Sequence, residues 1–131
     1  MLPSGCATFR HDWNRAVSYP PPAADLQGPW QGVWASEVNG HNDQLRCVVT
    51  KKQDGLYRAR FQARYRKVLT FGYTVSLRTA GAGEALKFQG DANLGWYAGG
   101  RYHYEGHADA TNFFATYSCK YDHGTFRMAR P

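Results

Sequence analysis

The stretch Gly28-Pro29-Trp30-Gln31-Gly32-Val33-Trp34 carries the pattern Gly-x-Trp twice in succession. Side chains alternate between the two faces of a β-strand, so Trp30, Gly32 and Trp34 share one face. Two indoles on one face supply a large apolar surface, and each needs a partner for its N–H. Gly32 between them leaves room for a neighbouring side chain to cross. The stretch therefore predicts the first strand of a sheet, with Trp30 in the core and Trp34 either in the core or lining a pocket.

From residue 30 onward, apolar and polar residues alternate with a period of two, which is typical of half-buried strands. The clearest run is 57–66, where aromatic and small residues alternate with four arginines and a glutamine. The other runs are 45–49, 69–78, 86–92, 101–109, 113–119 and 126–130. Turn-forming residues separate them at 39–40, 53–55, 81–83, 99–100, 109–112 and 122–124. Eight strands joined by short hairpins close most simply into an all-β, antiparallel up-and-down barrel. A two-sheet sandwich is the alternative, but it usually needs longer connections.

Gly28-x-Trp30 at the head of the first strand resembles the signature of the calycins, the lipocalin, fatty-acid-binding and avidin-like barrels. In lipocalin-like barrels an arginine of the last strand stacks over the first-strand tryptophan, and Arg130 matches that position. The resemblance covers residues 28–131 in pattern. It implies a barrel closed at one end by Trp30 and Arg130 that carries a small ligand inside.

An eight-stranded barrel is just wide enough to be filled by side chains or to hold one small ligand. The inward positions are rich in aromatic residues, and six of these are tyrosines, whose buried hydroxyls need hydrogen-bond partners. Those hydroxyls favour water, a ligand or a wet mouth, whereas the small inward residues favour a filled barrel. The candidate ligand-binding residues are Trp34, Tyr57, Phe61, Tyr73, Phe88, Tyr104 and Tyr117.

Catalytic and metal-binding motifs are absent from the sequence, which has no G-x-S-x-G, P-loop, paired-cysteine zinc spacing or H-E-x-x-H. His103, Glu105 and His107 fall on one outward strand face, but the outer two lie too far apart to share a metal easily. The sequence thus predicts no enzyme, no metal and no cofactor. The glycines of the opening stretch also resemble the haem-binding nitrobindin signature, although Trp34 replaces its next glycine. Haem is therefore a remote alternative.

Residues 1–27 are interpreted as a tether ahead of the barrel domain, 28–131. Cys6 follows Leu2-Pro3-Ser4-Gly5, which resembles the end of a bacterial lipoprotein signal. This resemblance implies a lipid on Cys6 and, because Ala7 is not Asp, the periplasmic face of the outer membrane. A cytosolic chain with a stray cysteine is the alternative.

Phe9, Trp13 and Val17 recur at helical spacing, and Pro20-Pro21-Pro22 would end such a helix. This apolar stripe is expected either to lie on a membrane surface or to cap one end of the barrel. Cys47 and Cys119 fall on inward positions of strands that are not neighbours, so a disulfide between them is not favoured.

The net charge of +6 resides on the barrel, because residues 1–27 contribute none of it. Outward arginines on adjoining strands predict a basic patch that consists of Arg46, Arg58, Arg60, Arg64 and Arg66. It would attract anionic lipid headgroups. Nucleic acid is not expected, since the aromatics that could stack on bases point inward.

Together these features predict a non-catalytic, lipid-anchored envelope barrel that binds a small apolar or aromatic ligand. The alternative is a filled barrel, an interaction or structural lipoprotein whose basic outer face contacts an anionic partner or a membrane.

Overall fold

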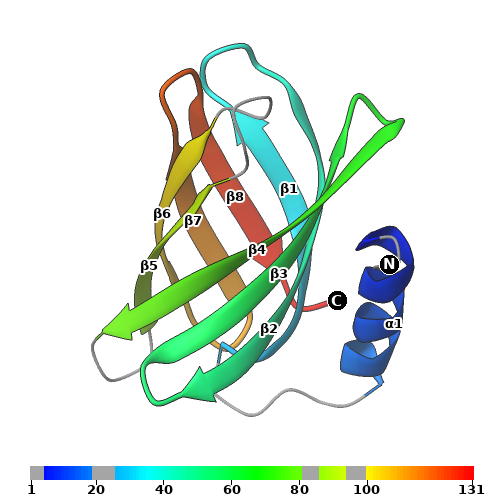
Figure 1. Ribbon diagram of the computed structural model, residues 1–131, viewed down its shortest axis with the longest axis vertical. Coiled ribbons are helices and arrows are strands. Elements are labelled where there is room, and N and C mark those ends of the chain that lie inside the picture. The colour runs from blue at the N-terminus through cyan, green and yellow to red at the C-terminus, as the bar shows by residue number, and fades with distance from the viewer. Residues whose placement is uncertain (1–4, 19–25, 81–85, 94–99) are drawn as a thin grey trace.

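The computed structural model describes residues 5–18, 26–80, 86–93 and 100–131. Within those residues, helix α1 (Gly5–Val17) precedes eight strands. The strands are β1 (Gly28–Ser36), β2 (Asn42–Gln53), β3 (Leu56–Tyr65), β4 (Leu69–Ala80), β5 (Leu86–Asn93), β6 (Arg101–Ala108), β7 (Asn112–Ser118) and β8 (His123–Ala129). Each strand pairs antiparallel with the next, and β8 pairs with β1, so the sheet closes into a barrel (Figure 1). The predicted eight-stranded barrel is confirmed.

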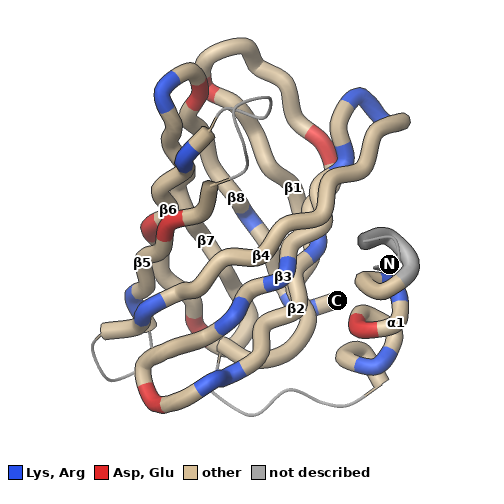
Figure 2. The backbone as a smooth tube through the Cα atoms, viewed as in Figure 1, with Lys and Arg blue, Asp and Glu red and all other residues tan. Residues whose placement is uncertain are grey.

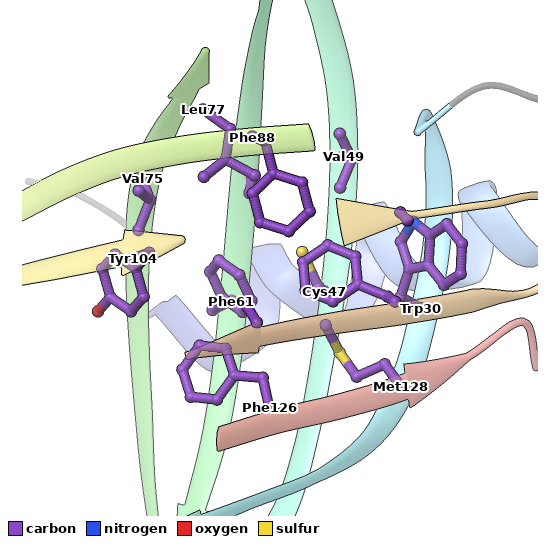
Figure 3. Close-up of a cluster of buried hydrophobic side chains, with 14 of the residues drawn as sticks. Trp30, Cys47, Val49, Phe61, Val75, Leu77, Phe88, Tyr104, Phe126 and Met128 are labelled. Atoms are coloured by element: carbon purple, nitrogen blue, oxygen red, sulfur yellow. The ribbon is translucent and has the colours of Figure 1, made fainter. Parts of the chain in front are cut away.

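Side chains along the strands alternate as the sequence pattern predicts. On β3, Tyr57, Ala59 and Phe61 are buried, whereas Arg58 between them is exposed. The inward residues of all eight strands form one buried cluster, much of which Figure 3 shows around Phe61. The period-two pattern of the sequence therefore gave the correct inward face for the body of the barrel.

Gly32 lets the backbones of β1 and β8 approach closely where the barrel closes, and this differs from the role that the sequence suggested. It lies opposite Met128 where β8 pairs with β1. A Cβ at this position would strike the backbone carbonyl of Arg127. The space beside Gly32 is thus filled by the backbone of β8, and the expectation that a side chain crosses there is wrong.

Helix α1 packs along the side of the barrel and covers the outer face of its neighbouring strands (Figure 1). Phe9 and Trp13 of the apolar stripe are buried against the barrel, with 2% and 8% of their surface exposed, while Val17 is half exposed. Neither expected position of the stripe is therefore correct. The helix does not cap a barrel end, and its two aromatic rings are not available to a membrane. Pro20-Pro21-Pro22 lies outside the described residues.

The β3–β4 connection is a tight turn that the sequence pattern missed. Arg66 and Lys67 both have positive φ, at 53° and 62°, and the amide of Val68 donates to the carbonyl of Tyr65 at 3.3 Å. The connection has three residues, 66–68, and its first two positions have the left-handed φ that Asn or Gly usually supplies in a hairpin turn. Arg66 is consequently a turn residue and does not continue the outward face of β3. The predicted turn at 81–83 lies outside the described residues.

Candidate functional site

The end of the barrel that contains Trp30 is sealed. The Trp30 side chain has no exposed surface, and its indole N–H donates to the carbonyl of Leu26 at 2.9 Å. The Arg130 guanidinium lies over the indole at 3.8 Å from the ring centroid and donates to the carbonyl of Pro29 at 3.0 Å. Such a cation–π contact contributes about 0.5–2 kcal/mol, more where water is excluded. The predicted pairing of Trp30 with Arg130 is confirmed.

Aromatic rings fill the middle of the barrel. Phe61 is the centre of this packing, with ring centroids at 5.2 Å from Tyr73, 5.5 Å from Phe126 and 6.4 Å from Tyr104. Offset and tilted rings at these separations attract one another beyond the area they bury. The described side chains therefore occupy the centre of the barrel, where the first interpretation expected a ligand.

The inward tyrosine hydroxyls find partners within the protein. The Tyr117 hydroxyl donates to Asp122 at 3.2 Å, the Tyr73 and Tyr104 hydroxyls share a hydrogen bond, and Tyr102 contacts the thiol of Cys119. No buried side-chain nitrogen or oxygen among the described residues lacks a partner. The hydroxyls consequently do not require a bound ligand, although the sequence left that alternative open.

Burial governs the titration of these tyrosines. Loss of water around the phenols raises the pKa of Tyr73, Tyr102, Tyr104 and Tyr117, and neighbouring acidic or phenolic groups raise the pKa of Tyr102 and Tyr117 further. All four hydroxyls are therefore neutral at physiological pH and act only as hydrogen-bonding groups. They offer no charged group for catalysis.

The opposite end, which we call the open end, carries partly exposed aromatic rings among its described residues. Trp34 stacks on Tyr65 at a centroid distance of 5.9 Å and an interplanar angle of 16°. The Tyr65 hydroxyl bonds Nδ1 of His41 at 2.9 Å, and the indole N–H of Trp34 donates to the carbonyl of Arg64 at 2.7 Å. Phe71 lies beyond Tyr65 at 6.4 Å. These rings keep part of their surface in contact with solvent, while the Trp34 N–H and the Tyr65 hydroxyl are already bonded, so a ligand here would be held by apolar contact.

The seven predicted ligand-binding residues divide between the two regions. Only two are partly exposed, Trp34 near the open end and Tyr73 beside Phe61 in the middle of the barrel. The other five are buried among packed side chains, and these are Tyr57, Phe61, Phe88, Tyr104 and Tyr117. The prediction omitted Tyr65, Tyr102 and His41, which lie at the open end. The position of Tyr65 and Tyr102 on inward faces near strand ends was the available signal.

The first part of β4, which follows the β3–β4 turn, does not pair with β5 and so lies outside the barrel wall. β3 and β4 pair along their length, from Leu56–Arg78 to Tyr65–Leu69, whereas β4 and β5 pair only from Arg78–Gln89 to Ala80–Lys87. The far end of the β3–β4 hairpin therefore extends past the barrel wall (Figure 1). For this reason Leu69 and Phe71, which the alternation assigned to the interior, are 52% and 47% exposed.

Asp43 holds the turn of this hairpin. Its side chain is 4% exposed, and its oxygens accept hydrogen bonds from Arg64 Nε and from the backbone amide of Lys67, each at 2.8 Å. Desolvation works to raise the pKa of the carboxyl, but the bonds from Gln44, Arg64 and Lys67 outweigh it, and the pKa is lowered. Asp43 is thus charged at neutral pH and fixes the turn that carries Arg66 and Lys67.

The predicted basic patch is not a single exposed surface, because four of its five arginines contact other side chains. Arg46 lies over the ring of Trp13 at 5.1 Å, and Arg60 binds Asp12 and Thr8 of α1. Arg64 is paired with Asp43, and Arg66 lies in the β3–β4 turn over the Tyr65 ring. Of the five predicted arginines, Arg58 alone keeps the exposed position on the barrel side that the prediction gave it.

One hollow over the described residues lies outside the barrel. It has a volume of about 470 Å³ on the outer face of β4–β7, where Phe114 and the side chains of Arg78, Lys87 and Glu105 border it. The groove is shallow and charged at its edges.

The remaining candidate residues carry no metal chemistry. His103 bonds Glu105 at 2.9 Å and Asp91 at 3.0 Å on the outer face, and both bonds raise its pKa. Within the described residues no cluster of His, Cys, Asp and Glu is arranged to hold a metal ion.

Cys47 and Cys119 are free thiols, in agreement with the expected absence of a disulfide. Cys6 lies in the first turn of α1, but its side chain is outside the described residues.

Comparisons with family models, with curated proteins and with solved structures found no match to this chain. Among the described residues, no helix has the length and apolar character needed to cross a membrane. The eight-stranded up-and-down barrel and its Trp30–Arg130 contact are compatible with a calycin-like fold.

Proposed function

We propose that this protein is a non-catalytic binding protein that takes a small, flat, apolar or aromatic ligand at the open end of its barrel. The observation that supports this proposal is the partly exposed stack of Trp34 on Tyr65 above a core filled by side chains. A ligand of this class would lie against the stacked rings at the mouth, since the middle of the barrel is occupied. Haem has no support, because the described inward positions of the barrel body carry no histidine.

The experiment is a fluorescence titration with N-phenyl-1-naphthylamine, a neutral aromatic probe. We expect saturable binding that Trp34→Ala or Tyr65→Ala weakens about tenfold, because each change removes buried area and a stacking contact of about 0.5–1.5 kcal/mol. Phe114→Ala is the matched control, since it removes a ring from the outer groove. Loss of binding in the control alone would move the site to the groove, and no saturable binding would contradict the proposal.

We further propose that a lipid on Cys6 anchors the protein in a bacterial envelope, at the periplasmic face of the outer membrane. The support is the resemblance of residues 2–6 to a lipoprotein signal end. Expressed in a bacterium behind a complete lipoprotein signal, the protein should sediment with membranes even when they are washed in high salt, which removes purely electrostatic binding, and Cys6→Ser should then be released. Cys119→Ser is the control and should stay with the membranes. Equal distribution of the wild-type and Cys6→Ser proteins would contradict the anchor.

A second candidate is a filled barrel that acts through its surface as an interaction or structural protein. The packing of Phe61, Tyr73, Tyr104 and Phe126 at the centre favours it. In that case the probe titration shows no binding, although the fold and the anchor are intact.

A further inference from the structure

Exposed apolar side chains gather at one end of the molecule. Seven large hydrophobic residues of the described chain are exposed, and five of them lie at or beside the turns of the open end. These five are Val38, Val68, Leu69, Phe71 and Tyr121. Scattered exposed apolar residues are normal, but a cluster at one end marks an interaction surface.

The β3–β4 hairpin carries the densest part of this cluster. Val68 is 80% exposed, Leu69 52% and Phe71 47%, directly after the exposed cations Arg66 and Lys67. We call residues 66–71 the hairpin tip. Figure 1 shows the tip projecting past the barrel wall, and Figure 2 shows its basic residues at the turn. A projecting convex tip cannot bind a ligand within itself, but it can enter another surface.

The charge of the tip is not cancelled locally. The nearest carboxylate is Asp43, which already accepts from Arg64 and from the amide of Lys67 and is almost fully buried. The Arg66 guanidinium lies over the Tyr65 ring at 5.4 Å, where its charge faces solvent. An anionic partner is therefore the complement of the two cations, and an apolar layer is the complement of the three hydrophobic residues.

We propose that the hairpin tip docks the protein onto an anionic phospholipid bilayer. Val68, Leu69 and Phe71 enter the boundary between headgroups and acyl chains, while Arg66 and Lys67 bind phosphate groups. The geometry suits this role, because Asp43 fixes the turn and so presents both cations in advance. The amino-terminal end of α1 is also directed toward the open end of the barrel (Figure 1). Docking requires neither the ligand of the open end nor the lipid on Cys6.

The test uses the whole chain with Cys6→Ser, so that no lipid contributes. Sedimentation with vesicles of phosphatidylglycerol and phosphatidylcholine should show binding that falls as salt rises, and pure phosphatidylcholine should bind far less. Arg66→Gln with Lys67→Gln should weaken binding about 30-fold at low salt, since each basic residue near an anionic surface contributes about fivefold. Val68→Ser with Leu69→Ser should weaken it at every salt concentration.

A matched control removes the same charge from the side of the barrel. Arg58→Gln with Arg78→Gln changes two exposed cations on β3 and β4 at a distance from the tip. This pair should leave vesicle binding within about threefold of the parent, because the field of a charge is screened over about 10 Å. An equal loss in both pairs would overturn the proposal in favour of a general basic surface. Circular dichroism of each variant checks that the barrel is folded.

Depth of entry supplies a second measurement. A polarity-sensitive fluorophore on Val68→Cys, with Cys6→Ser and Cys119→Ser also present, should shift to the blue when anionic vesicles are added. The same label on Ser76→Cys, on the outer face of β4, should not shift. No shift at position 68 would overturn insertion. A shift without vesicles that depends on protein concentration would assign the tip to a second copy of the chain instead.

Discussion

Trp30 and Trp34 lie on the same face of β1, but they lie at opposite ends of the barrel and differ in exposure. The Trp30 ring has no exposed surface and is covered by Arg130, whereas the Trp34 ring is partly exposed and stacks on Tyr65. Both indole N–H groups donate to backbone carbonyls. The ends therefore differ in what covers the ring face and not in whether the polar atom is bonded. The closed end contributes stability, while the open end keeps partly exposed apolar surface, where we propose that a ligand binds.

The two thiols that lie in the barrel give the largest expected contrast between the ends. Cys47 is fully buried opposite Trp30, and burial raises its pKa, whereas Cys119 is partly exposed beside the open end. In the Cys6→Ser protein, iodoacetamide should modify Cys119 in the native state. Cys47 should react at least about a thousandfold more slowly, because its exposure requires global unfolding. Intact mass against time measures both rates, and similar rates would mean that the closed end is not sealed.

Truncation of the two indoles compares the same change at each end. Trp30→Ala should reduce the free energy of unfolding by about 3–5 kcal/mol, since it leaves a cavity in a closed core. Trp34→Ala should reduce it by about 1–2 kcal/mol, because part of its surface is already in water. Urea unfolding followed by circular dichroism gives both values. Equal losses would contradict the difference between the ends.

Removal of the arginine that covers Trp30 tests the closed end alone. Arg130→Ala should reduce the free energy of unfolding by about 1–3 kcal/mol through the lost cation–π contact and packing. Arg127→Ala is the control on the outer face, where its guanidinium lies over Phe114 at 4.6 Å. That exposed pair should contribute less than about 1 kcal/mol. If the control were the more harmful change, the inward register of β8 would be wrong.

The body of the barrel could be predicted from the sequence, because alternation alone decides which face of a strand is buried. That is why the inward positions of Tyr57 and Phe61 follow from the pattern, whereas the contact of Arg130 with Trp30 was implied by the resemblance to lipocalin-like barrels. The open end could not be predicted in the same way. Alternation continues through Leu69 and Phe71 although β4 has left the barrel there, and periodicity does not report where a neighbouring strand stops pairing.

Contacts between residues that lie far apart in the chain could not be predicted from the sequence either. The outward arginines looked free because helix α1, which covers Arg46 and Arg60, is distant in the chain. The β3–β4 turn was missed because Arg66 and Lys67 have no local preference for positive φ. It is Asp43, more than twenty residues earlier, that stabilises this turn by accepting from the Lys67 amide.

The same turn supplies the smallest expected effect, at the open end. A residue other than glycine with left-handed φ is disfavoured by about 1–2 kcal/mol, and glycine removes that penalty but gives the unfolded chain more freedom to lose. Lys67→Gly should therefore raise the free energy of unfolding by about 0.5–1 kcal/mol, which thermal unfolding can measure. Lys67→Ala is the matched control, because it removes the same side chain but keeps the Cβ, and it should give no gain. Equal stability of the two variants would contradict a left-handed turn held by Asp43, and the open end would then owe its shape to a different contact.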